Sequence, residues 1–210
     1  MLDTGEINLV SADLPAIDLR GSRTGRINGR HLTVHGDLNL AALYNPQGGE
    51  QHGAFSASEV VDLINAKIGG EADFKGGRFH YSETGAAPWE KIQKIAINLT
   101  GAEVDGDVTA CCGFESQGCT FLAETTIGGD LSCFGGRFIN PDNVALTGAG
   151  NDIKGYVFLA PNTGFVPASF GFESDGVVTF ANARVAASFA VVRAKFGGKA
   201  TEHHGFLPTT

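Results

Sequence analysis

The chain has 210 residues, of which 42% are hydrophobic and 18% charged, and its formal net charge is −8. This length favours one domain, and the apolar content supports a large core, which excludes a disordered chain. No apolar run approaches the roughly 20 residues that span a bilayer. The acidic segment 1–6 lacks the apolar core of a signal peptide. We therefore expect a cytoplasmic protein that does not enter a membrane.

Five-residue units open the chain. Residues 7–11, 12–16 and 17–21 each begin with a small or branched apolar residue, followed by Asn or Asp and then by Leu. The unit returns at residues 97–101. A period of five does not suit an amphipathic helix, which needs apolar residues three and four positions apart. It predicts a chain that turns a corner every few residues and points one large apolar residue inwards on each side. The 30 glycines suit such corners, because glycine tolerates tight turns.

Longer motifs recur at a spacing of 58 or 59 residues. Ile-Gly-Gly-acid occurs at 68–71 and 127–130, Gly-Gly-Arg-Phe at 76–79 and 135–138, and Gly-Phe-Glu-Ser at 113–116 and 171–174. Aligning them predicts stacked coils with backbone hydrogen bonds between strands about 4.8 Å apart. One aligned position holds β-branched residues, and their uneven spacing predicts loops that bulge from several coils: Val34, Ile68, Val104, Ile127, Ile153 and Val185.

The same alignment predicts which residues point into the core. They come in pairs two positions apart: Leu38 and Leu40, Ala72 and Phe74, Val108 and Ala110, Leu131 and Cys133, Val157 and Leu159, Phe189 and Val191. Cys133 is therefore expected to be a core residue and not a nucleophile. The other three cysteines, Cys111, Cys112 and Cys119, match no zinc pattern together with it. We expect all four to be reduced thiols.

The five-residue units resemble the pentapeptide-repeat family, and this resemblance implies a right-handed quadrilateral β-helix. The longer motif at 127–141 is similar to a group of uncharacterised bacterial proteins whose coils contain Gly-Ala-Arg-Ile-Gly-Gly-Asp-Leu and Gly-Gly-x-Phe-x-Asn-Pro. We therefore expect an all-β solenoid of this type, forming a single domain over residues 1–210.

Loops and caps are expected at four places. The insertion at 45–67 predicts a short helix over about 56–66, capped by Ser58. The insertions at 80–95 and 160–170 contain Trp89 and Phe165, which are candidate anchors for a partner. Packing of Trp89 over its own coil is the alternative interpretation. The tail at about 197–210 is expected to cap the last coil and its open strand edge.

Acidic residues crowd the middle of the chain, and the repeat alignment places several of them at one corner. The aligned corner position holds Asp37, Glu71, Asp107 and Asp130, with Glu103 and Asp105 nearby. In one interpretation these carboxylates accept hydrogen bonds from corner amides. In the other they form an acidic strip that attracts a basic protein surface. The family resemblance implies a sharper form of the second interpretation, a DNA-mimic inhibitor of a nucleic-acid-binding enzyme.

Neither a catalytic site nor a cofactor site is predicted. The chain lacks Gly-x-Ser-x-Gly, a phosphate-binding glycine loop and His-Glu-x-x-His, and the three candidate metal ligands His31, His35 and Asp37 form only a weak pattern. Direct nucleic-acid binding is disfavoured, since it needs clustered Lys and Arg. Two alternatives remain open. One is an assembly module that stacks end to end as a homo-oligomer, and the other is a carbohydrate-active β-helix enzyme using Asp107 and Asp130.

Overall fold

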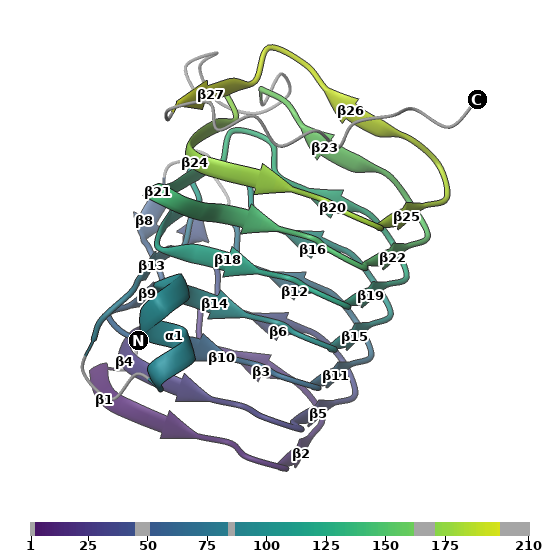
Figure 1. The fold of residues 1–210 in the computed structure, drawn as a ribbon. Coiled ribbons are helices and arrows are strands. Elements are labelled where there is room, and N and C mark those ends of the chain that lie inside the picture. The colour runs from purple at the N-terminus through teal and green to yellow at the C-terminus, as the bar shows by residue number, and fades with distance from the viewer. Residues whose placement is uncertain (1–2, 45–50, 84–86, 162–170, 198–210) are drawn as a thin grey trace.

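The computed structural model describes residues 3–44, 51–83, 87–161 and 171–197. In this part of the chain nearly every element is a β-strand that pairs in parallel with a strand of the preceding or following coil. Figure 1 shows the strands stacked in columns, from β1 at one end to β27 at the other. The chain passes four short faces in each coil, which we call the first to fourth faces in chain order. The arrangement is all-β and solenoid-like.

The third face is a seven-stranded sheet in which each coil contributes one two-residue strand. Its register pairs Val34 with Ile68, Ile68 with Val104, and so on to Val185. The predicted column of β-branched residues is therefore confirmed. The strands are β2 (Asp13–Leu14), β5 (Thr33–Val34), β11 (Lys67–Ile68), β15 (Glu103–Val104), β19 (Thr126–Ile127), β22 (Asp152–Ile153) and β25 (Arg184–Val185).

The fourth face is a second seven-stranded sheet, and it contains the predicted inward pairs. These residues are buried from Leu38 to Leu159, and Cys133 is fully buried as predicted. The last pair differs, because Val191 is 48% exposed on the terminal strand of the sheet. The strands are β3 (Ile17–Asp18), β6 (Leu38–Asn39), β12 (Ala72–Asp73), β16 (Val108–Thr109), β20 (Leu131–Ser132), β23 (Val157–Leu159) and β26 (Phe189–Val191).

The first and second faces belong to one eleven-stranded sheet, because several strands run on from one face to the next. The strands that cover both faces are β1 (Asp3–Asn8), β4 (Arg23–Asn28), β21 (Arg137–Thr147) and β24 (Glu173–Thr179). The first face also contains β9 (Ser56–Ala57), β13 (Arg78–His80), β17 (Glu115–Gln117) and β27 (Lys195–Gly197). The second face also contains β10 (Val61–Asp62), β14 (Ile95–Asn98) and β18 (Cys119–Phe121).

The predicted helix over residues 56–66 is wrong. This segment contains β9 and β10 instead, and Ser58 lies between them with its amide bonded to Thr24 O at 3.0 Å. Val61 and Leu63 are fully buried against neighbouring coils, so tertiary packing decides against the local helical pattern. The helix of the described residues is α1 (Pro88–Gln93), inside the predicted insertion at 80–95. An antiparallel hairpin, β7 (Leu43–Tyr44) and β8 (Gln51–Gly53), forms another insertion.

A stack of phenylalanine rings runs behind the first face, and every ring except the last, Phe196, is fully buried. Consecutive ring centroids lie 5.1–5.6 Å apart along Phe55, Phe79, Phe114, Phe138, Phe172 and Phe196. The rings alternate between two positions of the coil. Phe138 occupies the strand centre, where its register partners in the neighbouring coils are Ser116 and Ser174.

The coils on either side carry their ring two residues earlier, at Phe114 and Phe172. At that position the Phe138 coil has Gly136, where an added Cβ would lie 3.0 Å from the Phe138 ring and 2.5 Å from Ala110 O. Two coil types therefore alternate, which explains why the long motifs recur at twice the length of a coil.

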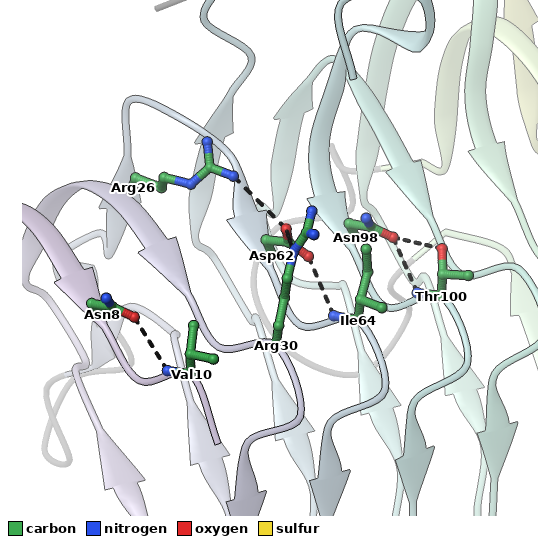
Figure 2. Close-up of polar contacts among 8 residues, drawn as sticks. All are labelled: Asn8, Val10, Arg26, Arg30, Asp62, Ile64, Asn98 and Thr100. Atoms are coloured by element: carbon green, nitrogen blue, oxygen red, sulfur yellow. Dashed lines mark hydrogen bonds and ion pairs between the residues drawn. The ribbon is translucent and has the colours of Figure 1, made fainter. Parts of the chain in front are cut away.

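The Asn or Asp of the five-residue unit closes the turn that follows the second face. Its Oδ1 accepts a hydrogen bond from the amide two residues later, at 3.3 Å in Asn8 and Asp62 and at 3.1 Å in Asn98 (Figure 2). This contact is the usual Asx turn. The Asn or Asp at this position is therefore needed to form the turn.

Candidate functional site: an acidic ridge between the third and fourth faces

Four acidic residues line the corner at which the third face turns into the fourth. Asp37, Glu71, Asp107 and Asp130 each precede a residue of one register column, which runs Leu38, Ala72, Val108 and Leu131. They therefore occupy equivalent positions on consecutive coils, about 4.8 Å apart. Asp37 is exposed and the other three are half-buried. We call these four residues the acidic ridge.

Each ridge aspartate ties its coil to the next one. Asp37 Oδ1 accepts a hydrogen bond from the amide of Glu71 at 2.9 Å, and Asp107 Oδ1 accepts one from the amide of Asp130 at 2.7 Å. Asp130 Oδ1 repeats the contact with the amide of Tyr156 at 2.8 Å. These bonds support the interpretation in which the carboxylates accept from corner amides. The amides belong to the following coil, so the contact joins coils.

The glycines of the repeated Gly-acid pairs are the other half of this contact. A Cβ added at Gly70 would lie 2.1 Å from Asp37 Oδ1, and one at Gly129 would lie 2.0 Å from Asp107 Oδ1. Such distances are far inside van der Waals contact, so an aspartate in one coil requires glycine in the next. The recurrence of Gly-Gly-acid in the sequence records this requirement.

The sequence of charges along the ridge differs from that along the first and third faces. On the first face opposite charges alternate, and Arg137 pairs with Glu115 at 2.6 Å and with Glu173 at 3.6 Å. On the third face Glu103 pairs with Lys67 at 3.5 Å. No ridge carboxylate forms an ion pair with any residue of the described segments. The ridge is thus a column of like charges, whereas the first and third faces hold ion pairs.

The remaining predicted residues do not converge on a second site. Asp105 is exposed on the third-face side of the ridge, where it lines a shallow groove with Lys67 and Glu103. Trp89 lies on α1 and is 39% exposed. Phe165 lies outside the described residues, as does nearly all of the predicted capping tail.

The weak histidine pattern does not form a metal site. His31 occupies a corner with φ of 56°, and His35 Nε2 lies 2.6 Å from Asp13 Oδ1. Over the described ranges, no group of three or more His, Cys, Asp or Glu side chains is placed to hold a metal ion.

A buried ion pair was not predicted from the sequence. Asp62 is fully buried, and its Oδ2 lies 2.5 Å from Arg30 Nε and 3.8 Å from Arg26 Nη2 (Figure 2). Arg20 pairs with Asp18, and this hydrogen bond lowers the pKa of the aspartate. Arg20, Arg26 and Arg30 therefore each have a carboxylate partner. The one signal in the sequence was the charged Asp62 in a column that holds Asn28 and Asn98 in the neighbouring coils.

Comparisons with protein-family models, with curated proteins and with solved structures find no match to this chain. The described segments contain no helix whose length and apolar content would let it cross a membrane.

Proposed function

We propose that this chain is a right-handed β-helix of the pentapeptide-repeat type that works in the cytoplasm as a non-catalytic binding protein. The acidic ridge meets a basic surface on a protein partner. The observation that carries the proposal is the charge order: like charges stack on the ridge, whereas the first and third faces hold ion pairs. Structural ties alone do not require the negative charge, because an asparagine Oδ1 accepts the same amide hydrogen bond.

Electrostatics favours a cationic partner at this corner. Neighbouring ridge carboxylates repel one another by about 1 kcal/mol or less at a water-exposed edge. A basic surface relieves this repulsion and is attracted by the summed charge. The alternating first face offers no comparable gain, since its charges already cancel. The attraction falls with added salt, because the Debye length is about 8 Å at physiological ionic strength.

A DNA-mimic inhibitor is the sharper form of the proposal, and charge density limits it. Duplex DNA carries one charge per about 1.7 Å, whereas the ridge carries one per roughly 4.8 Å of stacking. The ridge covers four coils, or about 15 Å between its end residues. It therefore suits an enzyme surface that contacts a short stretch of phosphates, with Asp105 adding charge beside it.

The test removes ridge charge without removing the ties between coils. Tagged wild-type chain and a D107N/D130N variant are used to capture proteins from cell lysate, and the bound proteins are quantified by mass spectrometry. We expect a basic protein on the wild type that falls by up to about thirtyfold on the variant, since the two lost charge contacts are together worth up to about 2 kcal/mol. Duplex DNA should displace it if the mimic form holds.

The matched control is E115Q/E173Q, which removes the same charge from the first face. It should retain the partner. If D107N/D130N retains the same proteins as the wild type, or if both double variants lose them equally, the ridge is not the binding site.

End-to-end assembly is the second candidate, and the last described coil favours it. Val191, Val192 and Phe196 are each about half exposed there. Exposed apolar residues on the terminal coil of a solenoid are suited to stacking. In this case the wild-type bait should recover untagged copies of the same chain, and D107N/D130N should recover them equally well.

A further inference from the structure

Two adjacent cysteines lie at the corner between the fourth and first faces. Cys111 and Cys112 follow β16, and their Sγ atoms are 2.9 Å apart. Cys111 is 4% exposed, whereas Cys112 is half-buried. The pair therefore presents one accessible sulfur with a second sulfur directly behind it. Cys119 and Cys133 are both buried.

Cys112 occupies a backbone position that the two adjacent coils give to glycine. Gly76 and Gly135 lie at the same corner of the adjacent coils, with φ of 63° each, and Cys112 has φ of 58°. The register follows from the bonds of the Gly76 amide to Cys111 O and of the Cys112 amide to Phe134 O. Placing a non-glycine residue there costs on the order of 1 kcal/mol or more. Replacing Cys112 by glycine should therefore not strain this corner.

The two sulfurs differ in acidity. The hydrogen bond from the Cys111 thiol lowers the pKa of Cys112 to about 7, and the Lys75 ammonium of the preceding coil acts in the same direction against the effect of burial. The contact with Cys112 and burial raise the pKa of Cys111. Burial alone raises the pKa of Cys119 and Cys133 to about 12. A thiol whose pKa is near the ambient pH attacks disulfides most effectively.

We propose that Cys111 and Cys112 form a redox-active dithiol that exchanges with small disulfides of the glutathione type. The Cys112 thiolate attacks one sulfur of the oxidant, forms a mixed disulfide and releases one small thiolate. The Cys111 thiol then loses its proton and attacks Cys112 Sγ, which forms the Cys111–Cys112 bond and releases the second thiolate. The two cysteines lose two electrons, and the oxidant is reduced to two thiols.

The product is expected to be easily reduced again. Adjacent residues have Cα atoms about 3.8 Å apart, below the usual 4.4–6.8 Å of a disulfide. A strained disulfide is labile, and labile disulfides are the regulatory or catalytic ones. The cysteine pair and the acidic ridge lie at different corners of the coil, since the ridge lies between the third and fourth faces.

The test treats the full chain with oxidised glutathione at neutral pH and follows intact mass with time. We expect the wild type to lose two hydrogens, with complete reversal by dithiothreitol. C111S should stop as a mixed disulfide that carries one glutathionyl group. Cys112→Gly, which suits this corner as Gly76 does, should react at least about tenfold more slowly because the remaining thiols are buried. C119S is the matched control and should behave as the wild type.

Circular dichroism verifies that each variant is folded. The proposal fails if the folded wild type stays unmodified, or if Cys112→Gly reacts as fast as the wild type. It also fails if C111S forms no stable mixed disulfide.

Discussion

Replacing Phe138 by alanine should lower the free energy of unfolding by about 3–5 kcal/mol. The ring is fully buried, with Phe114 at 5.1 Å on one side and Phe172 at 5.3 Å on the other. Gly136 beside it offers no side chain to fill the cavity, and Ser116 and Ser174 are too short to reach across. Urea denaturation at 25 °C, with the slope compared between variants, measures the loss.

Phe196→Ala is the matched control at the end of the same stack. That ring is 52% exposed, so its removal should cost about 1 kcal/mol. Equal losses for the two variants would contradict the claim that the stack is a continuous core element.

Replacing Asp62 by alanine should destabilise the protein by about 3 kcal/mol, the lower end of the range for breaking a buried ion pair. The substitution removes the Asp62 carboxylate from beside Arg30 and Arg26, whose side chains are 37% and 16% exposed. Water therefore solvates part of each guanidinium group, which reduces the loss of stability. The turn also loses the bond from the Ile64 amide to Asp62 Oδ1.

Asp62→Asn separates the two effects and is the control. Asparagine occupies this column at Asn28 and Asn98, and its Oδ1 keeps the bond to the Ile64 amide. We expect it to lose about half as much stability as the alanine variant in thermal and urea unfolding. A loss as large as that of Asp62→Ala would mean that the charge pair alone stabilises this corner.

The columns of the fold could be predicted because burial follows a regular pattern along the chain. Val34, Ile68 and Val104 stand out in the sequence as recurring β-branched residues, and Cys133 follows from the same alignment. The helix around Ser58 was wrong because Val60, Val61 and Leu63 have spacings that a helix and two coil faces share. Only the neighbouring coils decide between these structures.

Contacts between coils were harder to predict. The alignment of Asp107 with Asp130 is visible in the sequence, but the tie from Asp107 to the next coil's amide depends on stacking. The Asp62–Arg30 pair joins residues 32 positions apart, with no local pattern to connect them. The motifs around the phenylalanines recur every 58 or 59 residues. The reason is visible only in three dimensions, where a coil with its ring at the strand centre, as at Phe138, alternates with coils that carry the ring two residues earlier, where the Phe138 coil has Gly136.

The central structural claim concerns the ridge aspartates Asp37, Asp107 and Asp130, each of which ties one coil to the next through Oδ1. The most direct measurement is a double-mutant cycle at Asp107 and Gly129, read by urea denaturation of the wild type, D107A, G129A and the double variant. The Cβ of G129A would displace Asp107 Oδ1, which lies 2.0 Å from it. With Asp107 shortened to alanine, the collision with Oδ1 is gone, and the tight contact of the Cβ with the Asp107 backbone N at 3.1 Å remains in both backgrounds. We expect the double variant to lose at least about 1 kcal/mol less than the sum of the single losses. Losses that add to within about 0.5 kcal/mol would contradict the claim and show that Asp107 does not hold the next coil.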